Sequence, residues 1–161
     1  MPSDRVLPDA VVADATVRRW GRCFADVDRR MVRSCRALRP RVARIALALV
    51  YLWFGLVKLT GHSDAGPLAA ALTARTIGSA HFALAFNTLA VFECLIGIVV
   101  LVRRARALVP PLIGLHLAVV CSPLVLVPHL TWQGFLLPTM DGQYILKNAL
   151  VVAAAMAVYA P

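Results

Sequence analysis

Four apolar stretches, each near the length of a membrane-crossing helix, constrain this chain more than any other feature of its sequence. They cover approximately residues 42–60, 81–102, 107–127 and 143–160. A helix needs about 20 apolar residues to cross a hydrocarbon layer of about 30 Å. Because that layer holds no water to satisfy the backbone, a segment that crosses it alone must be helical. The pattern predicts an all-α membrane protein in which residues 41–161 form a four-helix transmembrane bundle.

The charges divide the chain into a basic head, residues 1–40, and an apolar body. Of the 17 Lys and Arg residues, 11 lie at or before Arg44, together with five of the eight acids. A basic head can indicate nucleic-acid binding, but no zinc-finger spacing or other nucleic-acid motif accompanies it. Membrane orientation and anionic lipid explain arginines beside a membrane span more simply. We therefore expect no nucleic-acid partner.

The arginines beside the apolar stretches predict how the bundle is oriented. Four of them lie between residues 36 and 44, and three between residues 103 and 106 join the second stretch to the third. The other two connections carry Arg75 as their only Lys or Arg. Since positively charged connections stay in the cytoplasm, we expect both termini there and residues 61–80 and 128–142 outside. Pro67 and the Ala/Leu run after it predict a short helix over Pro67–Thr76.

The head has the spacing of an amphipathic helix. Its apolar residues recur three, four or seven positions apart, at Val17, Trp20, Phe24, Val27, Met31 and Leu38. The arginines expected to face lipid phosphates are Arg18, Arg22, Arg29, Arg33 and Arg36. A basic helix of this kind lies on a membrane surface, with its apolar side in lipid. We expect it on the cytoplasmic leaflet; the alternative is a partner-binding or partly disordered arm.

Six polar residues inside the apolar stretches are the candidate ligand-pocket residues, namely Lys58, Asn87, Glu93, His116, Lys147 and Asn148. An ionisable group at mid-depth costs about 2.5–3.5 kcal/mol on insertion scales, so such groups usually face the protein interior. Glu93 and His116 each lie ten residues from the connecting arginines, hence at a similar depth of about 15 Å. A Glu93–His116 pair at the midplane is therefore geometrically allowed.

Lys58 and Lys147, with Asn87 and Asn148, are predicted at matched depth in the outer third of the layer. We expect these four side chains to converge on a polar pocket able to hold a quinone carbonyl, a small anion or a lipid headgroup. The alternative for each lysine is snorkelling, in which the ammonium reaches the headgroups along lipid. His116 alone is more often a hydrogen-bonded core residue, and a carboxyl as deep as Glu93 is either protonated or paired.

The sequence contains no motif from which a catalytic residue or a metal site can be named. The four cysteines include no C-x-x-C, and the four histidines include no i, i+4 ligand pair. Cys94 and Cys121 differ in depth by about 9 Å, whereas a disulfide needs Cα atoms within about 7 Å. We expect no catalytic residues and no metal.

Three segments resemble the DoxX-like family of small bacterial membrane proteins. They are "RIALALVYLWFGLVKLTG", "FECLIGIVVLVRR" and "GQYILKN", and the likeness covers about Arg41 to Tyr159. The resemblance implies a multi-pass four-helix bundle in the bacterial cytoplasmic membrane, with Lys58, Glu93, Lys147 and Asn148 at the family's polar motif positions. The name-giving relatives are a small subunit of a thiosulfate:quinone oxidoreductase. Other relatives are linked to oxidative or reactive-chlorine stress, and many have no assigned activity.

We therefore expect a small membrane subunit that anchors or serves a quinone-linked redox or oxidative-stress-defence system, without chemistry of its own. Quinone is the candidate cofactor. The candidate partners are anionic lipid, a soluble oxidoreductase and a second copy of the chain. One alternative is a small proton or solute carrier in which Glu93 and His116 relay protons. Another is a purely structural bundle whose polar residues fix the helix register.

Overall fold

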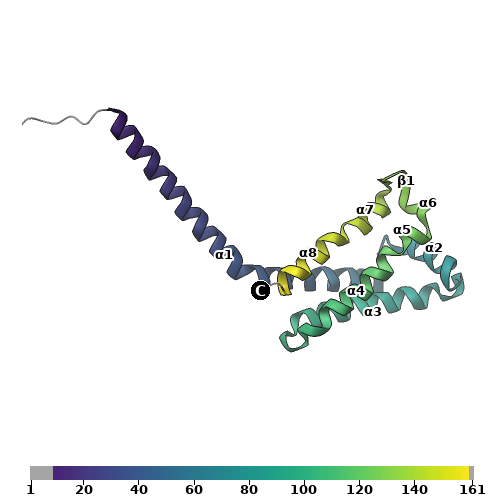
Figure 1. Ribbon diagram of the computed structural model, residues 1–161. Coiled ribbons are helices and arrows are strands. Elements are labelled where there is room, and N and C mark those ends of the chain that lie inside the picture. Colours follow the sequence, from purple (N-terminus) through teal and green to yellow (C-terminus); the bar gives the residue numbers. More distant parts are fainter. Residues whose placement is uncertain (1–8, 160–161) are drawn as a thin grey trace, which may run out of the picture. The chain divides into compact units, whose positions relative to one another are not determined.

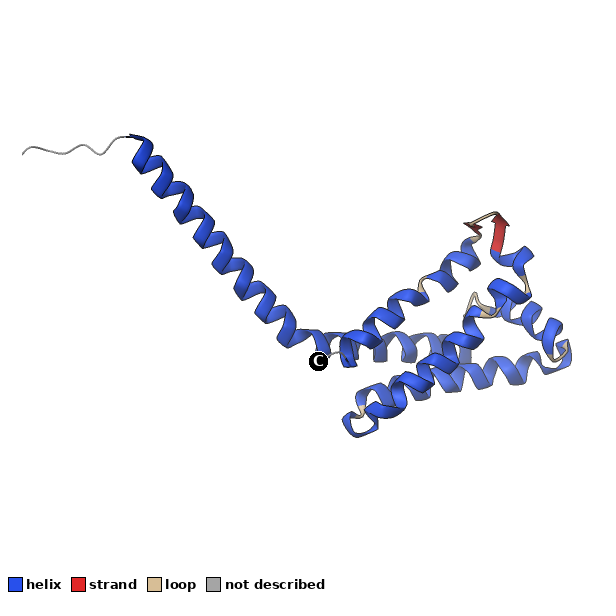
Figure 2. Cartoon of the chain, viewed as in Figure 1, coloured by secondary structure: helices blue, strands red, loops and turns tan. Residues whose placement is uncertain are grey.

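The computed structural model describes residues 9–159, and side chains from residue 24 to residue 158 (Figures 1 and 2). The first helix, α1, runs over Asp9–Leu59 and contains Pro40. The chain divides into two compact units, residues 1–39 and residues 40–161, and each is described by itself. We call them the arm and the body.

The arm is helical throughout its described part. Its side chains from Phe24 onward are exposed, including the apolar ones. Arg29 donates to a carboxylate oxygen of Asp26 at 2.7 Å, and Arg33 Nε donates to the backbone oxygen of Arg29 at 3.3 Å. Contacts between residues three or four apart stabilise an exposed helix. Arg18 and Arg22 lie outside the residues whose side chains are described.

The described part of the chain is mostly helical and holds three helices long and apolar enough to cross a membrane. They span Phe24–Leu59, Ser79–Leu101 and Arg103–Leu126. The second begins with the 3-10 turn η1, Ser79–His81, and continues as α3, Phe82–Leu101. The third begins with the 3-10 turn η2, Arg103–Leu108, followed by α4, Val109–Cys121, and α5, Pro123–Leu126. The helix is interrupted before Pro123, whose ring nitrogen has no hydrogen to donate.

The fourth apolar stretch differs from the continuous helix that its hydropathy predicts. It forms two shorter helices, α7 over Met140–Leu146 and α8 over Asn148–Tyr159, which meet at Lys147. The side-chain amide of Asn148 donates to the backbone oxygen of Ile145 at 3.0 Å. Because this amide occupies a carbonyl that helical backbone bonds also use, it favours an interruption here. A fourth membrane-crossing helix stays a prediction.

The two connections at the end of the body away from η2 contain short helices and strands. After α1 come α2, Gly66–Thr76, and η1; after α5 come α6, Pro128–Thr131, and a small antiparallel hairpin, β1 (Trp132–Gly134) and β2 (Leu137–Pro138). Figure 2 shows this hairpin in red. The indole of Trp132 donates to the backbone oxygen of Leu124 at 3.1 Å, and the Thr139 hydroxyl caps α7 by accepting from Gly142.

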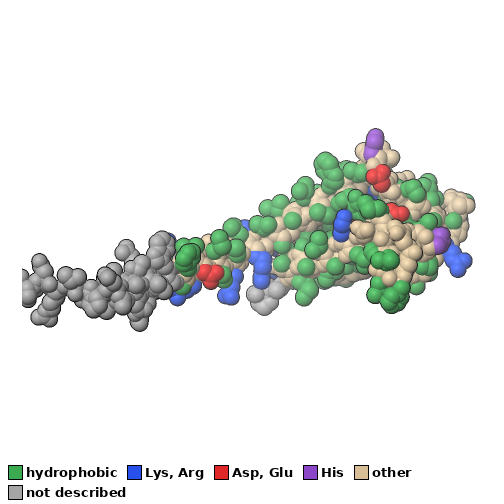
Figure 3. Space-filling view, turned by 90° about the horizontal axis from the view of Figure 1, so that it is seen from above, with side chains coloured by type: hydrophobic (Ala, Val, Ile, Leu, Met, Phe, Trp, Pro, Cys, Tyr) green, Lys and Arg blue, Asp and Glu red, His purple; other side chains and the backbone are tan. Residues whose placement is uncertain are grey.

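The apolar core of the body lies between α1, α3 and α4. It consists of Leu47, Ala48, Tyr51, Ile96, Val100, Val109 and Ile113. Two glycines let α1 and α3 approach closely. A Cβ on Gly55 would lie 2.6 Å from Cys94 Sγ, and one on Gly97 would lie 2.7 Å from Leu52 Cγ. Small residues at such positions allow two helix backbones to come together. The remaining surface of the body is rich in hydrophobic side chains, as the space-filling view shows (Figure 3).

Candidate functional site: a buried polar array

Four polar side chains from three helices form one hydrogen-bonded chain inside the body. Lys58 Nζ donates to both carboxylate oxygens of Glu93, at 2.7 Å and 2.9 Å. His116 Nε2 lies 3.0 Å from Glu93 Oε1, and the Tyr51 hydroxyl lies 3.2 Å from His116 Nδ1. All four residues are buried. We call this set, Tyr51, His116, Glu93 and Lys58, the buried array.

Helix periodicity explains how the residues meet. Tyr51 and Lys58 are seven residues apart on α1, so two helical turns place them on the same face. Glu93 lies on the buried face of α3 with Ala90 and Gly97, where α1 approaches α3 closely. His116 follows the core residue Ile113 by three positions on α4. The short turn η2 holds α3 and α4 side by side (Figure 1).

The chemistry of the groups fixes the direction of each hydrogen bond. An ionised carboxylate only accepts, so the Nε2–H of His116 donates to Glu93. In a neutral imidazole the other nitrogen then accepts, so the Tyr51 hydroxyl donates to Nδ1. The rings of Tyr51 and His116 meet edge to face, with centroids 5.0 Å apart. With a neutral His116 the array carries one positive and one negative charge, which balance.

Burying these charges is tolerable only because they are paired. Moving one ion out of water costs several kcal/mol after relaxation, and an ion pair offsets this when its remaining donors and acceptors are also satisfied. No side-chain nitrogen or oxygen of the array is left without a partner; among the described residues only Arg44 Nε is buried and unpaired. The Lys58 ammonium also lies 5.9 Å from the ring centroid of Phe54. The array therefore contains no unpaired charge.

The structure brings together three of the six candidate pocket residues. The Glu93–His116 contact that matched depth allowed is present at 3.0 Å. Two features of the network were not predicted from the sequence, namely Lys58 as the partner of Glu93, and Tyr51. Their helix heights put Lys58 about 6 Å beyond Glu93, a gap that a lysine side chain can bridge. The seven-residue spacing of Tyr51 and Lys58 was the signal for Tyr51.

The other three candidates do not join the array. Lys147 is exposed, with its ammonium 4.5 Å from the ring centroid of Tyr144, and Asn87 is exposed too. Asn148 is half-buried and uses its amide on the backbone of α7. We expected Lys58 to meet Asn87, Lys147 and Asn148 in one polar pocket, but in the structure its ammonium donates to Glu93. A buried ammonium is stabilised by a carboxylate and repelled by a second ammonium, so Lys58 turns toward Glu93. Ligand binding by any of the six residues stays a prediction.

The described part of the chain shows no site built for metal or thiol chemistry. No group of three or more His, Cys, Asp or Glu side chains there is arranged to hold a metal ion. Cys35, Cys94 and Cys121 are free thiols. What the geometry offers instead is a place where a proton can be held: the imidazole lies between a hydroxyl and a carboxylate, both within hydrogen-bond reach.

In comparisons of this chain with protein-family models, with curated proteins and with solved structures, nothing matches.

Proposed function

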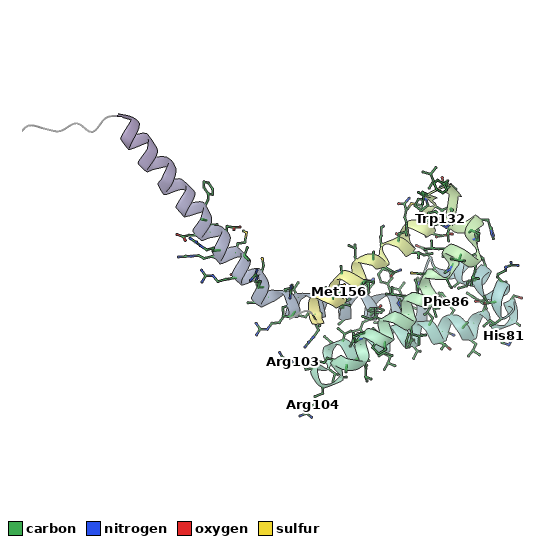
Figure 4. The ribbon with its side chains drawn as sticks, in the orientation of Figure 1. His81, Phe86, Arg103, Arg104, Trp132 and Met156 are labelled. Atoms are coloured by element: carbon green, nitrogen blue, oxygen red, sulfur yellow. The ribbon has the colours of Figure 1, made fainter. Side chains whose placement is uncertain are left out.

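We propose that the chain is a multi-pass protein of the bacterial cytoplasmic membrane with both termini in the cytoplasm. Three helices long and apolar enough to cross a membrane support the first part. Arginines cluster at one end of the body, and this supports the orientation. Arg103 and Arg104 lie at that end, and His81 lies at the other (Figure 4).

Thiol labelling in intact cells tests this orientation. Cys35 is exposed in the arm, and Phe135 is 92% exposed in the hairpin. An impermeant maleimide should label a Phe135→Cys variant from outside, and should label Cys35 only after the membrane is permeabilised. Labelling of Cys35 in intact cells would mean that the orientation is the reverse of the one proposed.

We further propose that the protein is a small accessory subunit of a quinone-linked oxidoreductase, serving a redox or oxidative-stress-defence system. The observation that carries this proposal is the continuous chain from Tyr51 through His116 to Glu93. Reduction of a quinone to a quinol takes up two electrons and two protons. The electrons come from the substrate of a soluble oxidoreductase partner, and the protons must reach the apolar layer. The resemblance to DoxX-like proteins supports the same assignment.

The array fits a role in holding and moving a proton better than a role in gripping the quinone. Tyr51, His116 and Glu93 already satisfy one another, so the third N–H of Lys58 is the one donor of the array left for a quinone carbonyl. When His116 takes up a proton at Nδ1, the Tyr51 hydroxyl rotates and accepts from it. The Nε2–H of His116 keeps its hydrogen bond to Glu93 Oε1 throughout.

The proposal is tested with membranes that contain the native partner. We expect a soluble oxidoreductase and bound quinone to co-purify with the chain. The Glu93→Gln/Lys58→Met double variant removes both charges and leaves an amide that His116 can still donate to. It should insert and co-purify normally, yet quinone reduction should slow by about 10²-fold or more, because positioned proton transfer contributes about 10²–10⁴-fold. Lys147→Met is the matched control and should leave the rate unchanged.

Two outcomes would contradict this proposal in different ways. If no oxidoreductase co-purifies and deletion of the chain leaves quinone reduction unchanged, the redox assignment is wrong. If the double variant folds and every assay stays at the wild-type level, the array only fixes helix register.

A proton carrier is the second candidate, because the same hydrogen-bonded chain can conduct without any quinone. Liposomes containing the purified protein then show a pH-driven proton flux that Glu93→Gln abolishes. Such flux in the absence of quinone and oxidoreductase would favour the carrier over the accessory subunit.

A further inference from the structure

Arg44 is the one place in the described chain where a buried side-chain donor has no acceptor. Its Nε atom is shielded from solvent and forms no hydrogen bond. Arg44 lies on α1, one turn before the core residues Leu47 and Ala48. Leaving a buried N–H unpaired costs about 1–3 kcal/mol, more for a charged group, so an acceptor that displaces the groups covering this atom would remove that cost.

Among residues 40–159, the end of the body that holds Arg44 carries no acidic side chain to supply that acceptor. The arginines there are Arg41 and Arg44 on α1 and Arg103, Arg104 and Arg106 in η2. The same core cluster contains Ala48 together with Val100 and Val109, which flank η2, so both sets lie at one end of the body.

The acids of the body are placed elsewhere. From residue 40 to residue 159 they are Asp64, Glu93 and Asp141. Glu93 is bonded to Lys58 and His116 in the buried array. Asp64 follows the end of α1, and Asp141 lies in the first turn of α7, so both are at the end opposite η2. The five guanidinium groups are therefore uncompensated within residues 40–159.

We propose that this end of the body binds the phosphate of an anionic phospholipid, with Arg44 as the residue that fixes the headgroup. A guanidinium presents Nε–H and Nη–H in parallel, which matches two oxygens of one phosphate. The η2 arginines add positive charge around it, and basic pockets between membrane helices bind anionic headgroups in this way.

The acceptor is a lipid phosphate because of where the arginines are. They stand where the apolar helices end, which is the level of the headgroups. This inference rests on the membrane placement proposed above and is independent of the redox role. It assigns to Arg44 a specific contact, in contrast to the diffuse attraction that exposed arginines exert.

Lipid binding by the purified full-length protein in neutral detergent tests the proposal. Phosphatidylglycerol and phosphatidylcholine with the same acyl chains are titrated, and bound lipid is counted by native mass spectrometry. We expect phosphatidylglycerol to be preferred by about tenfold, the effect of one charge-assisted hydrogen bond. Arg44→Lys keeps the charge but lacks Nε, and should remove most of that preference. Arg104→Lys, at an exposed arginine, should change it by less than about twofold.

Each remaining outcome counts against the proposal. Equal loss in Arg44→Lys and Arg104→Lys would mean a diffuse charged surface only. Displacement of the lipid by millimolar inorganic phosphate would mean a free-anion site. If Arg44→Lys is too unstable to purify, the wild-type comparison still decides, because equal binding of the two lipids overturns the site. A failed quinone assay leaves all of these measurements unaffected.

Discussion

Lys58 on α1 donates to both carboxylate oxygens of Glu93 on α3, at 2.7 Å and 2.9 Å, and both side chains are buried. A pair of this kind adds little net stability, because desolvation of both ions opposes their attraction. Its removal is nevertheless asymmetric. Loss of one partner leaves a buried charge, whereas loss of both leaves none. The two cases predict different stabilities.

Lys58→Met should lower the free energy of unfolding in detergent by about 3–5 kcal/mol, because Glu93 stays buried without its counter-ion. Lys147→Met is the matched control at an exposed lysine and should cost less than about 1 kcal/mol. Equal effects of the two substitutions would mean that Lys58 is not buried against Glu93.

The Lys58→Met/Glu93→Gln double variant should be more stable than Lys58→Met alone, since no unpaired charge is left. A double-mutant cycle that includes Glu93→Gln isolates the coupling of the pair, expected at about 0.5–3 kcal/mol or above. Additive losses would show that the two side chains do not interact.

Tyr51→Phe should destabilise the body by about 1–3 kcal/mol, because Nδ1 of His116 loses its only hydrogen-bond donor among the described residues. Tyr144→Phe removes the same hydroxyl from an exposed residue and should stay within about 0.5 kcal/mol of the wild type. Chemical denaturation of both variants, under identical detergent conditions, provides the comparison.

Gly97→Ala should cost about 1–3 kcal/mol, since the new methyl group would lie 2.7 Å from Leu52 Cγ and force α1 away from α3. Gly114→Ala is the control, because nothing lies within 4 Å of its added Cβ. That variant should be neutral or up to about 1 kcal/mol more stable, as expected of alanine in a helix. The prediction fails if the two glycines tolerate alanine equally.

In the arm, Met31→Asp should weaken binding of the full-length protein to vesicles that contain phosphatidylglycerol. Met31 is 63% exposed and falls on the apolar stripe defined by Phe24 and Val27. Ala37→Asp adds the same charge away from that stripe. A vesicle flotation assay should show a loss of several-fold for Met31→Asp and a smaller loss for Ala37→Asp. Identical losses would leave charge alone as the cause.

Helix positions in the body followed closely from hydropathy and turn residues. The second stretch, residues 81–102, matches α3 at Phe82–Leu101, and the helix predicted at Pro67–Thr76 matches α2 at Gly66–Thr76. Burial and proline placement are strong local signals. The interruption at Lys147 was missed, because it depends on one side-chain amide competing for one backbone carbonyl.

The candidate site was predictable only in part, for a geometric reason. Counting residues gives the height of each Cα, which sufficed for Glu93 and His116 because both side chains are short and level. It did not give the partner of Lys58, whose long side chain reaches a group at another height. Tyr51 stands in a run of apolar residues, and its hydroxyl gains a role only once α4 is packed against α1.

One helix supplies both ends of the buried array, since Tyr51 and Lys58 belong to α1 while Glu93 and His116 join α3 to α4 across η2. Turning α1 about its axis, or sliding it along its neighbours, withdraws the hydroxyl and the ammonium in the same movement. The bond between α3 and α4 is left in place. The register of α1 is thus fixed at two heights, and any displacement of α1 breaks the hydrogen bonds to His116 and to Glu93 together.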